Sequence, residues 1–401
     1  MATRQRWLTT ISLYVNYMVY GMAIVILAQN MASLGHQWQV GTAEVSYVIS
    51  SLGIGHLLVL YVAGILSDRW GRKLFVNLGI LAYLPFFIGI VFCHSTIMAY
   101  ALGVLAGMAN SFLDAGTYPT LMELFPEHEA SANIMIKAFS SVGELSLPLI
   151  VAALDANGRW YGWSFMLGAV ILIANLIFMQ WRQFPKRNQV PKPVATTPTE
   201  SARPVRFRTL QATLLTSFGY VGMATFYLIS QWLTEYGTEV VHLTLLRARL
   251  LVSVYSTGSI LGVLLTALVV NRWLKPAWFM VVDTVISLLA LLAMAAVPTF
   301  WVLFSGSLII GISATGGVLQ IGLTLMSDLY PAHKGRVLGI YYTASGLASF
   351  TIPLVTGGLA KTSIHQIMWF DVGIAVVGVL CALAVLALRR QPQPALAVES
   401  D

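Results

Sequence analysis

Long apolar segments separated by short polar breaks occupy almost the whole chain. A helix needs about 20 mainly apolar residues to cross a bilayer. The segments, each of roughly that length, lie at about residues 8–30, 45–66, 74–93, 97–122, 132–154, 162–181, 210–233, 246–270, 276–297, 299–326, 337–360 and 366–388. The pattern therefore predicts an all-α membrane protein with twelve transmembrane helices.

A polar stretch divides these segments into two sets of six. It contains Pro185, Pro191, Pro193, Pro198 and Pro204, and a composition of this kind is typical of a flexible connector because it cannot bury a core. The expected parts of the chain are an N-terminal six-helix bundle (1–182), a cytoplasmic linker (183–208), a C-terminal six-helix bundle (209–390) and a cytoplasmic tail (391–401).

The two sets of segments are related in sequence. Residues 123–126 (Glu-Leu-Phe-Pro) and 328–331 (Asp-Leu-Tyr-Pro) are each followed 22 positions later by a proline, Pro148 and Pro353. A second match, at a nearly equal shift, pairs Ser50, Gly55, Arg69 and Trp70 with Ser253, Gly258, Arg272 and Trp273. Parallel six-helix repeats with a binding site between them are a recurrent transporter architecture. We therefore expect two pseudo-symmetric bundles.

Composition and charge agree with a membrane location. Hydrophobic residues make up 57% of the chain and charged residues 10%, against roughly a quarter charged in soluble domains. The net charge of +7 follows the positive-inside rule, because 18 of the 23 Lys and Arg residues fall on one side if both termini are cytoplasmic. Nucleic acid is therefore not an expected partner. The two cysteines, Cys93 and Cys381, form neither a disulfide framework nor a metal set.

One loop carries a family resemblance. Residues 64–73, Gly-Ile-Leu-Ser-Asp-Arg-Trp-Gly-Arg-Lys, separate the second and third segments. They resemble the signature loop of the major facilitator superfamily, which implies that fold and a gate between its halves. In this reading Gly64 permits close helix approach and Gly71 a tight turn, while Asp68 latches the cytoplasmic side onto a helix N-terminus of the other half. Three basic residues anchor the loop: Arg69, Arg72 and Lys73.

A second resemblance concerns the fourth and fifth segments. Gly107, Leu113 and Asp114 in the fourth segment and Asn133, Gly143 and Pro148 in the fifth are similar to a pattern of the fucose-permease-like branch of that superfamily. The match covers about 45 residues. Since that branch moves sugars together with protons, the resemblance implies a proton-coupled sugar transporter.

Ionisable side chains inside a span cost roughly 2.5–3.5 kcal/mol on insertion scales and are functional candidates by default. Glu144, near the middle of its segment, is the first candidate for proton coupling, and Asp114 is the second. Lys137 is expected to form an ion pair with Asp114 or to bind an anion. It also lies on the same helix face as Glu144, seven residues away. Asp283, in the ninth segment, has no assigned role.

Amide and aromatic side chains indicate the wall of the cavity. The resemblance implies that the first, fourth, seventh and tenth helices line it, and amides together with aromatic faces suit a polyhydroxylated solute. The candidates for substrate binding are Asn16, Tyr17, Tyr20, Asn110, Tyr227, Gln231, Trp232 and Gln320.

These features predict a secondary active transporter of the bacterial inner membrane that carries a sugar-like solute together with a proton. Symport of an organic anion such as a sugar acid, and drug–proton antiport, stay open as alternatives. The seven histidines are scattered along the chain and no zinc spacing or nucleotide-binding loop is evident, so we expect no enzyme activity, metal or cofactor, with the proton gradient as the energy source. The partners expected are a small-molecule substrate and the lipid bilayer, and the chain is expected to be monomeric.

Overall fold

The computed structural model describes residues 3–126, 129–185, 205–270, 273–315, 318–330 and 334–390. Its first half consists of α1 (Thr3–Gln29), the short α2 (Met31–Trp38), α3 (Thr42–Trp70), α4 (Arg72–Gly89), α5 (Thr96–Leu124), α6 (Glu129–Ala156) and α7 (Gly162–Gln180). Its second half consists of α8 (Val205–Glu239), α9 (Leu245–Val269), α10 (Pro276–Ala296), α11 (Phe300–Ile310), a π-helical turn (Gly311–Thr315), α12 (Val318–Leu329), α13 (Lys334–Ala360) and α14 (Ile364–Arg390).

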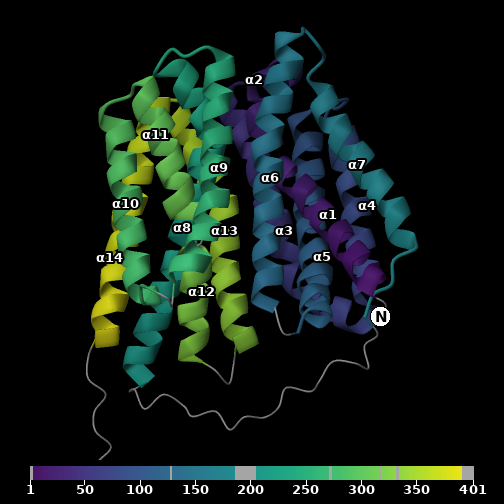
Figure 1. Ribbon diagram of the computed structural model, residues 1–401. Coiled ribbons are helices and arrows are strands. Elements are labelled where there is room, and N and C mark those ends of the chain that lie inside the picture. The colour runs from purple at the N-terminus through teal and green to yellow at the C-terminus, as the bar shows by residue number, and fades with distance from the viewer. Residues whose placement is uncertain are drawn as a thin grey trace, which may run out of the picture.

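Within these ranges eleven helices are long and apolar enough to cross a membrane. A twelfth crossing is built from α11, the π-helical turn and α12, which together cover the tenth predicted segment. The long helices stand side by side, and α1 and α8 both begin at the end of the molecule where α14 finishes (Figure 1). We call this the inner end and the opposite one the outer end.

The two halves meet mainly along two helix pairs, α3 with α13 and α6 with α9. Gly53 illustrates how closely they approach, because a Cβ atom there would lie 2.4 Å from the backbone nitrogen of Phe350 in α13. The polar bonds that join the halves among the described residues lie between the middle and the outer end. Ser141 faces Ser259 at 3.2 Å near the middle, and Ser46 donates to the Pro353 carbonyl at 2.8 Å further out.

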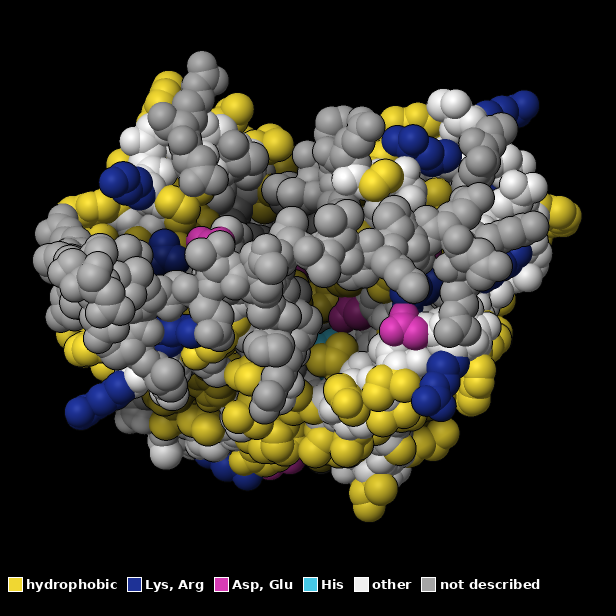
Figure 2. Space-filling view, turned by 90° about the horizontal axis from the view of Figure 1, so that it is seen from below, with side chains coloured by type: hydrophobic (Ala, Val, Ile, Leu, Met, Phe, Trp, Pro, Cys, Tyr) yellow, Lys and Arg dark blue, Asp and Glu magenta, His cyan; other side chains and the backbone are white. Residues whose placement is uncertain are grey.

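The inner end has a different surface. Seen from this side, Lys and Arg side chains lie around the rim, while acidic side chains and a histidine are visible set back near the centre (Figure 2). Basic residues that begin or end helices here include Arg4 in α1 and Lys73 in α4. This distribution is the one the positive-inside rule gives for a cytoplasmic face.

Inside the first half, α1 and α6 touch backbone to backbone. A Cβ at Gly143 would lie 1.9 Å from the Met18 carbonyl oxygen, and one at Gly21 would lie 1.9 Å from that of Ser140. Only glycine permits this approach. The contact fixes the relative height of Tyr17 on α1 and Glu144 on α6, the two helices that carry most of the candidate site.

Candidate functional site

Tyr17 and Asp114 form one polar centre of the site. The Tyr17 side chain is buried, and its hydroxyl donates a hydrogen bond across to the Asp114 carboxylate on α5. The rings of Tyr20 and Tyr118 stand edge-on to Tyr17, with centroids 5.5 and 6.0 Å away. Asp114 therefore lies beside a cluster of tyrosines, and the Tyr17 hydroxyl is its hydrogen-bond donor.

Lys137 and Glu144 form a second polar centre, two turns apart on one face of α6. The Lys137 Nζ lies 3.1 Å from Glu144 Oε1, and the Ser140 hydroxyl donates to the same oxygen at 3.0 Å. The Glu144 side chain is 1% exposed, whereas that of Lys137 is 28% exposed. The ammonium also lies 4.7 Å from the ring centroid of Phe226 on α8, so this centre touches both halves.

The structure corrects the expected pairing of Lys137 with Asp114. Lys137 reaches along its own helix to Glu144, and Asp114 instead accepts the Tyr17 hydroxyl. The physical reason is geometric, because residues seven apart lie on one helix face and the flexible lysine stem spans the two turns between them.

Tyr20 and Tyr227 connect the two centres. Tyr20 on α1 is within electrostatic range of both Asp114 and Tyr227, and Tyr227 on α8 is within range of Glu144. Tyr20 and Tyr227 thus link the Tyr17–Asp114 centre of the first half to Glu144 and to α8 of the second half.

Two of the expected cavity amides face elsewhere in this state. Asn16 is fully buried and its Oδ1 accepts a hydrogen bond from Asn175 Nδ2 on α7 at 2.7 Å. Asn110 is 7% exposed and accepts the Tyr83 hydroxyl of α4. Both amides therefore tie helices of the first half to one another and offer little surface to a solute. Helical periodicity gave the face on which they lie but not the neighbour that covers it.

Gln231 and Trp232 of α8 are also buried, at 1% and 2% exposure. Among the described residues, neither polar atom of the Gln231 amide nor the Trp232 indole nitrogen has a hydrogen-bond partner. Trp232 lines a cavity between α8 and α14, together with Tyr236 and Asp371. The side chain of Gln320, in α12, lies outside the described residues, as does that of Asn133.

The signature loop joins α3 to α4. Gly71 has φ 105°, a conformation that favours glycine. Asp68 forms an ion pair with Arg72 four residues along, and Arg72 also lies 3.5 Å from Glu123 of α5. Lys73 donates to the carbonyl oxygens of Gln180 and Arg182 at the end of α7, at 2.8 and 3.1 Å. The turn at Gly71 and the anchoring by Arg72 and Lys73 take the form that the sequence predicted.

Two expectations for this loop differ from the structure. A Cβ at Gly64 would meet nothing within 4 Å, so no helix packs closely there. Asp68 pairs inside its own loop and is 63% exposed. Arg69 is exposed. Asp68 is thus engaged within the first half in this state, which is one in which the halves are joined toward their outer end.

Sequence reasoning missed two charged residues that the structure buries. Arg249 in α9 is 4% exposed and binds Asp155 across the halves. Asp371 in α14 is 1% exposed and accepts the Thr225 hydroxyl at 2.8 Å. The position of Asp371 inside the last apolar segment was a usable signal. For Arg249 the signal was its place one turn inside a helix.

No group of three or more His, Cys, Asp or Glu side chains that could hold a metal ion occurs in the part of the chain that the structure describes. The site offers one buried carboxylate (Glu144), one partly buried carboxylate (Asp114), one lysine and a set of phenols. Such an arrangement can exchange protons and bind a polar solute, and it contains no evident nucleophile–base pair.

The fold and this site define a membrane transporter built from two helix bundles. The family model of the Major Facilitator Superfamily matches residues 7–282 and 241–400, and the chain belongs to that superfamily. It is a secondary transporter of that family and not an enzyme.

Two relatives of this chain match it over nearly its whole length. It is 47% identical over 375 residues to the inner membrane transport protein YdiM of Escherichia coli (strain K12), covering 94% of this chain and 93% of that one. It is 40% identical over 381 residues to the MFS-type transporter YfkL of Bacillus subtilis (strain 168), covering 93% and 94%. Like these relatives, the chain is an integral membrane protein.

Among solved structures, that of a D-xylose–proton symporter superposes with a TM-score of 0.75, covering 94% of this chain and 97% of that chain. At 13% sequence identity this likeness shows the fold alone.

Proposed function

We propose that the protein is a proton-coupled symporter of a sugar-like, polyhydroxylated solute, with Glu144 as the coupling carboxylate and Asp114 as the second candidate. The observation that carries the proposal is the ion pair between the buried Glu144 and the partly exposed Lys137, which touches the other half through Phe226. Ionisable groups inside a span are rarely retained without a function. The similarity of α5 and α6, the fourth and fifth predicted segments, to the fucose-permease-like branch supports a sugar-like solute.

The coupling step follows from the two oxygens of Glu144. Oε1 holds Lys137 and Ser140, while Oε2 has no hydrogen-bond partner among the described residues. A proton that binds at Oε2 neutralises the carboxyl and weakens its hold on the lysine. Lys137 Nζ then becomes a donor for a solute hydroxyl between the halves, so solute binding and proton binding favour each other.

A second candidate, symport of a sugar acid, is favoured by the exposure of Lys137. Its side chain is 28% exposed whereas its partner is 1% exposed, so an ammonium freed by protonation of Glu144 could pair with a solute carboxylate. In this reading the proton neutralises Glu144, which releases Lys137. The carboxylate of the solute then becomes the partner of the ammonium.

We further propose that one chain is the transport unit. The two bundles, residues 1–182 and 209–390, would rock about the central site, with the linker 183–208 and the tail 391–401 on the cytoplasmic side. Both bundles contribute to the site, since Tyr17, Asp114 and Glu144 come from the first and Phe226 and Tyr227 from the second.

The proposal is tested by uptake into proteoliposomes with an inward proton gradient, using neutral sugars, sugar acids and small carboxylates. Accumulation of a neutral sugar that disappears when the gradient is collapsed supports the first candidate. Accumulation of sugar acids alone supports the second, and Lys137→Met should then abolish it, while Arg159→Gln, an exposed charge outside the site, should not. Uptake that does not respond to the gradient would refute proton coupling.

A further inference from the structure

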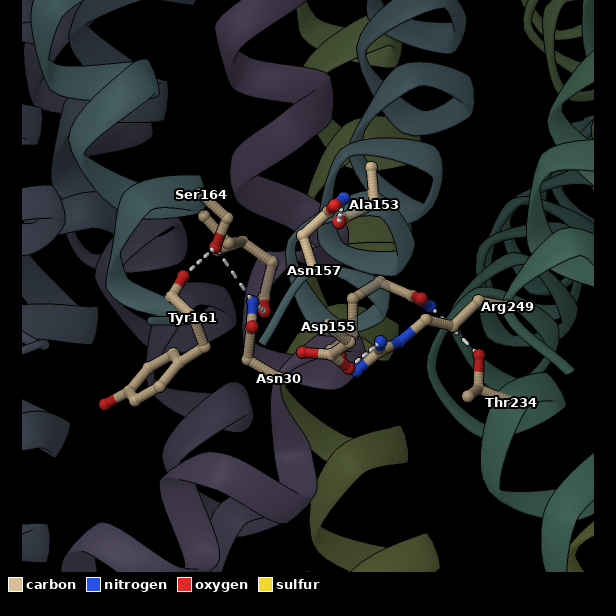
Figure 3. Close-up of polar contacts among 10 residues, drawn as sticks. Asn30, Ala153, Asp155, Asn157, Tyr161, Ser164, Thr234 and Arg249 are labelled. Carbon is tan, nitrogen blue, oxygen red and sulfur yellow. Dashed lines mark hydrogen bonds and ion pairs between the residues drawn. The ribbon is translucent and has the colours of Figure 1, made fainter. Parts of the chain in front are cut away.

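A buried arginine joins the two halves at the outer end. Arg249, in the first turns of α9, is 4% exposed. Its guanidinium forms an ion pair with the Asp155 carboxylate near the end of α6, and its Nη2 donates to the Gln29 carbonyl at the end of α1, at 3.1 Å (Figure 3). One side chain of the second half thus binds two helices of the first. The planar, fork-shaped guanidinium suits such simultaneous contacts.

Further polar contacts between the halves surround this arginine. Gln29 also donates from its side chain to the Thr234 hydroxyl of α8 at 3.1 Å. At the other helix pair that joins the halves, Lys361, just after α13, and Glu44 of α3 form an ion pair of 3.0 Å. Because these bonds cross from one half to the other, the outer end can open only when they break.

The first-half partners of Arg249 are held firmly. Asn30, next to Gln29, donates to the Ile26 carbonyl at 2.9 Å and to the Ser164 hydroxyl of α7 at 3.3 Å (Figure 3). The end of α1 is thereby fixed to its own bundle. The bond from Arg249 to the Gln29 carbonyl therefore joins the whole first half, and not a loose segment, to α9.

A second carboxylate is available to the same arginine. Glu235 of α8 directly follows Thr234, whose hydroxyl accepts a bond from the same Gln29 whose carbonyl Arg249 binds. It belongs to the same half as Arg249 and lies within electrostatic range of it. A buried guanidinium without a counter-charge is strongly disfavoured. When the halves separate at the outer end, Asp155 leaves with the first half while Glu235 stays with Arg249.

We propose that Arg249 is a positioning residue for alternating access that exchanges partners during the transport cycle. With the outer end closed, it binds Asp155 and the Gln29 carbonyl and holds α6 and α1 against α9. With the outer end open, it pairs with Glu235 of its own half. Asp155 and Glu235 compete for one guanidinium. The difference in the free energy of their pairing with Arg249 sets the population in which the outer end is open. This inference rests on the transporter fold and is independent of solute and proton coupling.

The test measures the separation of the halves by double electron–electron resonance in detergent or nanodiscs, without solute or proton gradient. Spin labels are placed at the outer end, through Asn157→Cys just after α6 and Thr244→Cys just before α9, after Cys93→Ala and Cys381→Ala. Arg249→Gln should raise the population with the long distance severalfold. Glu235→Gln, which removes the competing partner, should lower it below that of the unmodified protein.

The controls separate this exchange from a general loss of structure. Arg247→Gln removes an exposed arginine two residues away and should leave the distance distribution unchanged. Arg249→Lys keeps the charge but loses the fork, so an intermediate population is expected, and it serves as the test if Arg249→Gln does not fold. An unchanged distribution in both Arg249 variants would overturn the latch. A rise of the long distance in Glu235→Gln, or no change, would overturn the exchange of partners.

Discussion

Single hydrogen bonds determine which polar side chains of this protein lie in the candidate site and which hold helices together. The Tyr17 hydroxyl donates a hydrogen bond to Asp114, and the Asn16 side-chain oxygen accepts one from Asn175 of α7. Both residues were expected to line the cavity, yet Tyr17 belongs to the candidate site and Asn16 to the packing of the first half. Burial of a polar group requires such a partner, since an unpaired one costs roughly 1–3 kcal/mol.

Tyr17→Phe removes the donor to the Asp114 carboxylate and leaves the ring. We expect the free energy of unfolding to fall by about 1.5–3 kcal/mol, the range for hydrogen bonds to charged groups. Solute affinity should weaken because Asp114 is no longer held in place. Thermal unfolding in detergent and equilibrium solute binding measure the two effects. Tyr61→Phe, on an exposed ring of α3, is the matched control; equal losses in both variants would contradict a specific role.

Asn16→Ala tests the reassignment of an expected cavity residue. Since Asn16 is fully buried against α7, the substitution should lower the unfolding temperature and leave the KM for uptake unchanged in the folded fraction. A KM that rises severalfold while the unfolding temperature stays constant would return Asn16 to the binding site.

At the scale of helices, close backbone contacts explain features of the fold that the sequence pattern did not predict. Apolar length predicted all the crossings because every span must satisfy its backbone groups within a helix. The break at Gly311–Thr315 in the tenth crossing was not predicted. It occurs where Gly311 lies so near α9 that a Cβ would be 2.1 Å from the Tyr255 carbonyl oxygen, and packing of this kind is not encoded in periodicity. A π-helical turn inside a helix is frequently found at functional sites.

For the charged residues of the site too, the sequence predicted the position on a helix but not the partner. Glu144 and Lys137 could be placed on one face from their spacing, whereas the choice of Lys137 between two carboxylates depended on side-chain reach in three dimensions. The burial of Arg249 depended on contacts with the other half, which lies about a hundred residues away in the chain. Local patterns therefore gave the elements, and the partners across elements came only with the fold.

Gly143→Ala should push α1 away from α6. The added methyl group would lie 1.9 Å from the Met18 carbonyl oxygen, so both stability and the alignment of Tyr17 with Glu144 should suffer, with uptake reduced at least severalfold. The control is Gly373→Ala in α14, where a Cβ meets nothing within 4 Å and the change should be neutral or stabilising by up to about 1 kcal/mol. Normal stability and uptake in Gly143→Ala would show that α1 and α6 can separate at no cost.

For the whole molecule, the described contacts define a state in which the halves are joined from the middle to the outer end. Arg249, Gln29 and Ser46 all bond across the halves in that region, while Asp68 at the inner end is paired within its own loop. Transport also requires a state in which the inner end is closed and the outer end is open. The resemblance implies that the signature loop of the first half stabilises that state.

Asp68→Asn should therefore act on the other state of the cycle. The variant should fold normally and keep the outer end closed, because its only ion pair among the described residues is with Arg72. It should nevertheless transport slowly, since the state with the inner end closed loses its latch. Labelling of a single outer-end cysteine by a membrane-impermeant maleimide, with and without solute, measures this. Faster labelling in Asp68→Asn than in the unmodified protein would contradict the assignment.

The central claim is that protonation of Glu144 couples transport to the proton gradient. The most direct measurement compares Glu144→Gln with the unmodified protein in proteoliposomes, for gradient-driven accumulation and for solute counterflow. An inward gradient of one pH unit can drive about tenfold accumulation at one proton per solute. We predict that Glu144→Gln loses this accumulation and retains counterflow, because the amide is permanently neutral and still occupies the site. Gradient-driven accumulation that persists in Glu144→Gln would contradict the account.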